Sequence, residues 1–128
     1  MPPDLHLVPP VGPEPPEHLT GEALVEWQRI APELRDVGLL GNLDRAVVAA
    51  YCVAYARWSE CERQVRDHGM LLRTRNGVPI PSPFLAAADR ALEQVRQLSE
   101  QIGLTASGRM RLTGHKVGAD RIVRMLGL

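Results

Sequence analysis

The 128-residue sequence predicts a mainly α-helical fold, a bundle of three to four helices with a short β-hairpin between the second and third long helices. Three long stretches place apolar residues every three or four positions, which gathers them on one face of a helix. Between the second and third of these stretches, an Asn-Gly pair is flanked by apolar residues. That pair is the strongest short signal for a hairpin turn.

The first helix is expected to begin near Thr20 and to end before Gly38. Threonine is a good N-cap, and the acid Glu22 suits the positive end of the helix dipole. Pro32 removes one backbone hydrogen bond and is expected to kink the helix. Gly38 suits the left-handed conformation that often follows a last helical turn. The buried stripe comprises Leu24, Trp27, Ile30, Ala31, Leu34 and Val37.

The second helix is the longest and is expected over residues 43–67, with Asn42 as its cap and Asp44 in its first turn. Its apolar face is wider than one stripe, because Val48, Cys52 and Val53 extend it. A helix that is apolar on more than one side lies deep in a core or is shared between subunits. In so short a chain we favour sharing. The predicted interface between copies comprises Val48, Tyr51, Tyr55, Trp58, Leu85, Leu92 and Val95.

Residues 70–81 change from helical spacing to short apolar runs around Asn76 and Gly77. This pair tolerates positive φ at both positions and predicts a two-residue hairpin turn. Pro79 confines the second strand to an edge, because proline lacks a backbone N–H. An irregular loop is the alternative interpretation.

The third helix is expected from Ser82, as cap, with Pro83 at the first helical position, to about Ile102. A short fourth helix is expected over residues 106–112. Three regions follow from this pattern. Residues 1–18 form a proline-rich arm that is extended or disordered, residues 19–112 form the helical domain, and residues 113–128 form a basic flexible tail.

Charge is unevenly distributed, although the chain has 15 basic and 15 acidic residues. Residues 1–44 carry eight acids and two bases, whereas residues 45–128 carry seven acids and 13 bases. The basic end could meet nucleic acid, or the opposite ends of neighbouring copies could attract each other. A mixed, solvated surface is the remaining interpretation.

Catalysis, metal binding and membrane insertion find little support in the sequence. Cys52 and Cys61 lie about 13 Å apart along one predicted helix, too far for a disulfide, and are expected to be reduced core thiols. The four histidines show no ligand spacing with them, so neither a metal nor a cofactor is expected. No phosphate-binding loop or nucleophile elbow is present. With no apolar run of 18 residues and no secretion signal, the protein is expected to stay in the cytoplasm where it is made.

An ordered series of short segments resembles the small subunit of phage terminase, the DNA-packaging machine of tailed phages. The resemblance covers about residues 19–112 and runs through segments 19–24, 29–34, 38–40, 44–45, 49–52, 55–58, 76–81 and 102–109. Ala106 and Gly108 stand where the family often has a proline and an acid or polar residue. The resemblance implies a non-enzymatic, ring-forming protein that recognises viral DNA and regulates the large subunit, which holds the ATPase and nuclease.

Eight basic residues are the candidates for contacts with double-stranded DNA. One is Arg45, which would begin the second helix of a helix-turn-helix near a groove, although the first 44 residues are acidic. The better electrostatic candidates lie on the hairpin and towards the C-terminus: Arg73, Arg75, Arg109, Arg111, Lys116, Arg121 and Arg124. Two other classes stay open, a helical dimeric DNA-binding regulator and an assembly adaptor without DNA affinity.

Overall fold

The computed structural model has three long helices and one two-stranded sheet, and it describes residues 14–41, 44–112 and 126. Helix α1 spans Gly21–Asp36, α2 spans Arg45–His68 and α3 spans Pro83–Gln101. Strands β1 (Leu71–Arg73) and β2 (Pro79–Pro81) lie between α2 and α3, and residues 106–112 are also helical. The mainly helical prediction with one hairpin is therefore confirmed.

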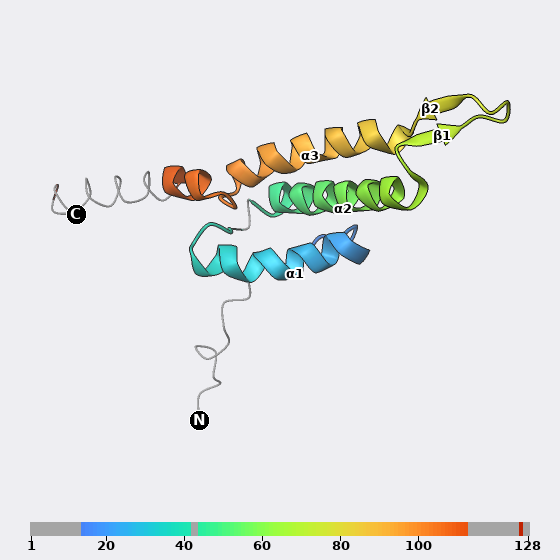
Figure 1. Ribbon diagram of the computed structural model, residues 1–128. Helices are drawn as coiled ribbons and strands as arrows, with labels where there is room; N and C mark the ends of the chain where they lie inside the picture. The colour runs from blue at the N-terminus through green and yellow to red at the C-terminus, as the bar shows by residue number, and fades with distance from the viewer. Residues whose placement is uncertain (1–13, 42–43, 113–125, 127–128) are drawn as a thin grey trace.

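Helix α2 is the central element, because it packs against both α1 and α3 (Figure 1). Its fully buried residues Val48 and Cys52 meet Ile30 of α1 in the core. Burying an aliphatic side chain of this size stabilises the fold by about 1.5–3 kcal/mol. The remaining buried core residues are mostly small or aliphatic: Leu19, Ala23, Trp27, Ala31, Leu34, Leu40, Ala49, Tyr51 and Ile102.

Two helix ends are closed by glycine, as the sequence indicated for both. Gly38 has φ +76°, and the next residue, Leu39, donates its N–H to the Leu34 carbonyl at 2.8 Å. Gly103 has φ +81° and plays the same part after α3. These bonds satisfy carbonyl groups that a helix end otherwise leaves without partners. Helix α1 continues through Pro32, which lies on its exposed face.

The predicted N-caps are formed in part. The Ser82 hydroxyl accepts a hydrogen bond from the Phe84 N–H at 3.2 Å, so the cap of α3 is confirmed. Thr20 occupies the cap position of α1 but makes no side-chain capping bond. Asp44, expected in the first turn of α2, is its N-cap and instead accepts from the Gly41 N–H at 3.0 Å. Asn42 lies outside the described residues.

The hairpin is confirmed, but its turn is wider than the expected two residues. The Thr74 N–H donates to the Val78 carbonyl at 2.9 Å, and the Gly77 N–H donates to the Thr74 carbonyl at 2.8 Å. Residues 75–77 therefore form a three-residue loop. Only Gly77 has positive φ (+81°), since no described residue other than glycine does. This is a turn followed by one left-handed glycine, so Asn76 does not need the positive φ predicted for it.

Candidate nucleic-acid and assembly interface

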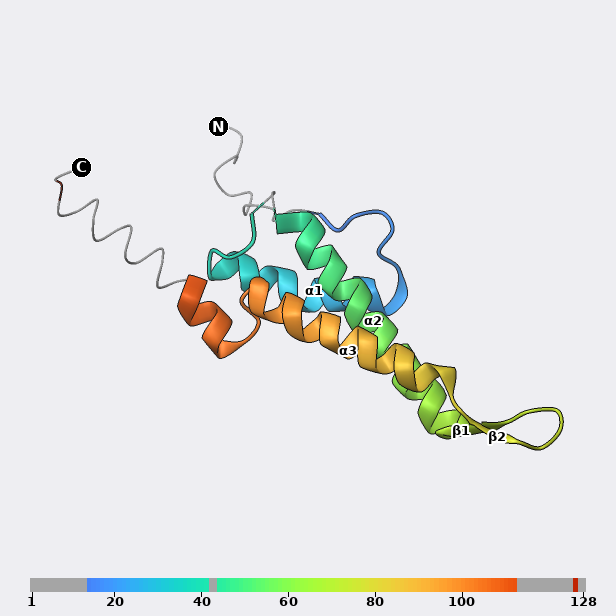
Figure 2. The ribbon, with the colours of Figure 1, turned by 90° about the horizontal axis from the view of Figure 1, so that it is seen from above.

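The two hairpin arginines lie at a projecting end of the molecule. The β1–β2 hairpin extends beyond the helices in both views (Figures 1 and 2). Arg73 and Arg75 are exposed there, and the Arg73 Nη1 donates to the Gly77 carbonyl at 3.3 Å, which orients the side chain along the loop. No aspartate or glutamate occurs in residues 69–88. The hairpin therefore presents positive charge without a nearby acid in sequence.

Arg109 and Arg111 lie at the other end of α3, on the helical segment 106–112 (Figure 1). The Arg109 Nη1 donates to the Leu104 carbonyl at 3.1 Å, and the Arg111 Nη2 donates to the Glu100 carbonyl at 3.2 Å. Helix α3 alone spans about 28 Å at 1.5 Å per residue. One protomer therefore does not bring the hairpin and C-terminal candidates together. Lys116, Arg121 and Arg124 lie outside the described residues.

Arg45 begins α2 and is exposed, with its Nε donating to the Glu14 carbonyl at 2.7 Å. Residues 37–44 separate α1 from α2. A DNA-binding helix-turn-helix joins its helices through a turn of about three to four residues, so this connection is too long for that motif. A phosphate contact by Arg45 stays a prediction without the helix-turn-helix geometry.

Two of the predicted interface residues are used within the protomer. Val48 is 0% exposed and Tyr51 is 4% exposed, and both belong to the core around α1 and α2. The protomer core itself buries these two side chains, which leaves them almost no surface for a contact with a neighbouring copy. The helical spacing was correct, but it did not show which apolar face α1 covers.

The other predicted interface residues keep some exposed surface. Tyr55 and Trp58 are half-buried with ring centroids 6.0 Å apart, and the buried Trp58 Nε1 has no hydrogen-bond partner in the described part of the chain. On α3, Leu92 is 44% exposed, while Leu85 and Val95 are half-buried. These five residues stay a prediction for contacts between copies.

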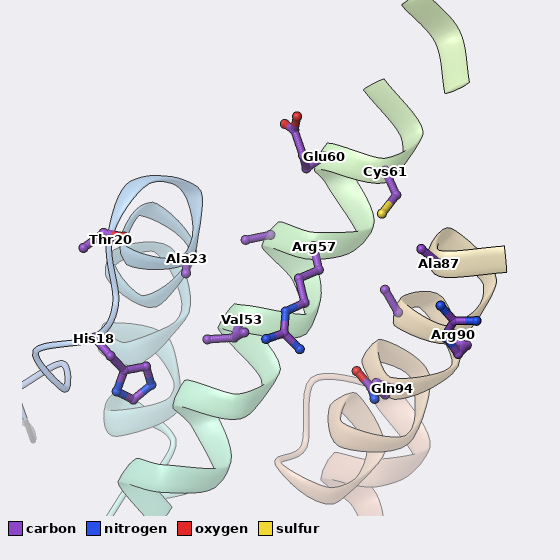
Figure 3. A pocket seen from close by; sticks show the side chains of 12 residues that line it. His18, Thr20, Ala23, Val53, Arg57, Glu60, Cys61, Ala87, Arg90 and Gln94 are labelled. Atoms are coloured by element: carbon purple, nitrogen blue, oxygen red, sulfur yellow. The ribbon is translucent and has the colours of Figure 1, made fainter. Parts of the chain in front are cut away.

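A groove of about 540 Å³ lies along α2 between α1 and α3 (Figure 3). Its apolar lining consists largely of small side chains, namely Ala23, Val53, Ala56, Ala87 and Ala91. Its polar lining includes Arg57 of α2 and Arg90 of α3, which lie on facing helices. The sequence alone does not predict this groove. Alanines on a helix face are compatible with a close-packed neighbour and with an open space alike. Cys61, expected in the core, lines the groove and is half-buried.

A charge network fixes α1 on α2 beside this groove. Arg63 donates from Nη1 and Nη2 to the two carboxylate oxygens of Glu22, at 2.7 and 2.9 Å. Hydrogen bonds from Arg63 lower the pKa of Glu22. Hydrogen bonds from Gln64 and Arg63 lower the pKa of Glu60 in the same network. Two planar groups that pair through two bonds fix orientation as well as distance.

A buried carboxylate lies deeper between the same helices. Glu26 is 2% exposed, accepts from the Tyr51 hydroxyl at 3.2 Å and pairs with Arg29 one turn along α1. Burial, and next the negative charge of Glu26, raise the pKa of the Tyr51 hydroxyl. Burial also raises the pKa of the Cys52 thiol to about 12. Both groups are thus held neutral, which suits a structural role better than a nucleophilic one.

Among residues 14–41 and 44–112, no cluster of histidine, cysteine, aspartate and glutamate side chains could hold a metal ion. In the same part of the chain, no helix has the length and apolar character needed to cross a bilayer. The features that the structure does present are a projecting basic hairpin, a second basic segment and an apolar groove.

Comparison with protein families supplies the class. The sequence matches the family described as phage terminase, small subunit, over residues 23–118. The match covers most of the chain, so this protein belongs to the terminase small-subunit family, whose role is in DNA packaging. Comparison with curated proteins and with solved structures gives no match.

Proposed function

We propose that this protein assembles into a ring, binds double-stranded phage DNA and regulates the terminase large subunit in the host cytoplasm. The observation that carries the proposal is the family match over residues 23–118. The projecting hairpin with Arg73 and Arg75 supports DNA binding, because charged groups on a protruding element can approach phosphates without steric hindrance. The low aromatic content and small core support assembly, because so small a domain gains stability from association.

The hairpin arginines are tested by replacing both with alanine. We expect weaker DNA binding, and the slope of log K against log salt should fall by about 1.8 for each hairpin that contacts DNA, because about 0.9 counterions are released per phosphate contact. The control is Arg96→Ala, since Arg96 is already paired with Glu93 at 2.6 Å. An unchanged affinity and an unchanged slope in the double variant would exclude the hairpin as a DNA contact.

The C-terminal basic residues are tested separately with a chain that ends after Leu112. This truncation removes Lys116, Arg121 and Arg124 and keeps Arg109 and Arg111. If the tail carries much of the DNA affinity, both affinity and salt slope should fall. If neither changes, the described helical domain is sufficient for binding.

Mass in solution and a gel shift separate the proposal from its two alternatives. A large closed oligomer that shifts phage DNA supports the terminase role as proposed. A stable dimer that shifts DNA would instead indicate a dimeric regulator. An oligomer with no DNA affinity would indicate an assembly adaptor, an alternative that the zero net charge of the chain favours.

A further inference from the structure

The β-hairpin has one edge that is open to further strand pairing. At its base, the Ser82 N–H donates to the Met70 carbonyl at 2.8 Å, and near its tip the Thr74 N–H donates to the Val78 carbonyl at 2.9 Å. Hydrogen-bonded and non-hydrogen-bonded pairs alternate along an antiparallel ladder. The residue pair midway between Met70–Ser82 and Thr74–Val78 is therefore also hydrogen-bonded. The residue pairs on either side of that middle pair are not.

This alternation makes the two edges of the hairpin different. The non-hydrogen-bonded pairs are Leu71 with Pro81 and Arg73 with Pro79. The N–H groups of Leu71 and Arg73 therefore point away from β2, and no described residue accepts from them. The corresponding positions on β2 are prolines, which have no N–H to offer. Strand β2 is closed to further pairing, whereas β1 has both donors and acceptors free.

The hairpin also exposes more apolar surface than an isolated hairpin normally keeps in water. Met70 is 65% exposed, Leu71 62%, Val78 55% and Ile80 41%. A lone two-stranded hairpin is marginally stable in water and normally needs a third strand or a packing partner. The open edge and the exposed apolar side chains lie on the same twelve residues, so one added strand could satisfy both.

The N-terminal arm contains a segment that fits this edge. Residues 4–8 (Asp-Leu-His-Leu-Val) are free of proline and are bounded by Pro3 and Pro9. Five residues are a common strand length. Residues 1–18 contain three acids and no lysine or arginine, whereas the hairpin contains Arg73 and Arg75 and no acid. Length, apolar content and charge are thus complementary.

We propose that residues 4–8 of one copy add as a third strand to the open β1 edge of a neighbouring copy. The added strand accepts from and donates to Leu71 and Arg73, and it covers apolar side chains of the hairpin. Asp4 lies in the positive field of Arg73 and Arg75. This exchange deepens the assembly part of the proposed function and does not depend on DNA binding.

The geometry requires a neighbour, because the arm cannot reach its own hairpin. The contact between Arg45 and Glu14 places the start of the described chain at the N-terminal end of α2. The hairpin follows the opposite end of α2, about 35 Å away at 1.5 Å per residue. The six residues from 14 back to 8 span at most about 21 Å. Even with the reach of the Arg45 side chain, residues 4–8 cannot pair along β1 of the same protomer.

Such an exchange is head to tail, with one arm given and one received by each copy. A contact of this kind uses two different surfaces and closes into a ring when its rotation divides a full turn. Each arm would add a small contribution to the free energy of association, and a closed ring would repeat that contribution at every contact between subunits. The exchange therefore supplies a ring contact separate from the helix faces.

The test uses the full chain with proline in the arm, as His6→Pro and Leu7→Pro. Successive N–H groups of a strand point to opposite sides, so one of these two variants removes a donor that faces β1. The matched control is Leu7→Val, which keeps the N–H and suits a strand. A second pair, Leu71→Pro and Leu71→Val, tests the receiving edge, and circular dichroism verifies that helicity is retained.

Two quantities are measured on each variant, the self-association constant by sedimentation and the amide exchange of residues 70–75 by mass spectrometry. We expect one arm proline and Leu71→Pro to weaken association and speed exchange by about tenfold, with both valine controls close to wild type. Faster amide exchange with unchanged association would also support the strand exchange between copies. In that case the helix faces would hold the assembly together.

Results that contradict the strand exchange can be told apart from results that contradict the proposed function. A wild-type chain that assembles, with no effect of either arm proline, overturns the strand exchange and leaves the ring proposal in place. If only Leu71→Pro has an effect, another strand occupies the edge and the arm proposal is wrong. A wild-type chain that stays monomeric overturns assembly and exchange together, whatever its DNA affinity.

Discussion

Glu26 is the residue whose environment departs most from what its type leads one to expect. Acidic side chains are almost never fully buried unless they are paired. Here Tyr51 supplies one hydrogen bond from α2, and Arg29 supplies a charge from the same helix. The carboxylate therefore joins α1 to α2 through the Tyr51 hydroxyl, and removing that hydroxyl leaves one carboxylate oxygen without its donor.

We predict that Tyr51→Phe destabilises the fold by about 1–2 kcal/mol, since a buried acceptor that loses its donor costs more than the bond itself contributes. Urea unfolding followed by circular dichroism measures the change. Tyr55→Phe is the matched control, because no hydrogen bond of the Tyr55 hydroxyl is found in the described part of the chain. Equal effects of the two substitutions would show that Glu26 does not depend on Tyr51.

The sequence could not reveal this pairing, although it placed Glu26 and Tyr51 on the correct helices. Helical spacing shows which residues share a face, but the contact partner depends on how the helices cross. For the same reason, helical spacing alone does not show that Val48 and Tyr51 lie in the protomer core. The alanine-lined groove escaped prediction because it is made by three helices together.

At the scale of elements, prediction succeeded where a single residue fixes the local conformation. Gly38 and Gly103 end their helices, Ser82 caps α3, and proline follows that cap, all as the sequence indicated. These signals are local and do not need the tertiary fold. The hairpin turn was less accurate, because Asn-Gly fits both a two-residue turn and the second half of a three-residue loop.

Gly103 meets two requirements, a positive φ in the backbone and a lack of space for a side chain. Experiments can separate the two. A Cβ atom there would lie 2.7 Å from Leu39 Cδ1 and 3.2 Å from Leu112 Cδ1, whereas a Cβ at Gly77 would meet nothing within 4 Å. Both glycines have φ +81°. The two positions therefore share the backbone strain and differ in the space around them.

We predict that Gly77→Ala costs about 1–2 kcal/mol from left-handed strain alone, and that Gly103→Ala costs about 1 kcal/mol more because Leu39 and Leu112 must shift. Thermal unfolding of the two variants gives the difference directly. A cost at Gly103 no larger than that at Gly77 would show that Leu39 and Leu112 move aside without penalty.

At the scale of the whole molecule, α1 is attached to the rest of the fold mainly through α2. The apolar core supplies most of that attachment, and the Glu22–Arg63 pair adds a polar contact near the C-terminal half of α2. The opposite helix, α3, carries an ion pair of its own between Glu93 and Arg96, which lies within one helix and joins nothing else. The two pairs therefore have different consequences when acid removes the carboxylate charge.

Arg63 lowers the pKa of Glu22, so the folded state binds this proton more weakly than the unfolded chain does. The stabilising contribution is complete above the unfolded value of 4.5 and is lost as pH falls through the lowered folded value. We predict that the thermal unfolding midpoint decreases as the pH is lowered from about 5 to about 3, and that Arg63→Gln makes this decrease shallower.

Arg96→Gln is the control, because it also raises a depressed glutamate pKa but leaves α1 attached to α2. The protection factors of the α1 amides, which are exchange rates corrected for the intrinsic rate at each pH, should fall with acid in the wild type and in Arg96→Gln. In Arg63→Gln they should already be lower at neutral pH. If all three proteins show the same acid profile in α1, the apolar core alone holds this helix in place.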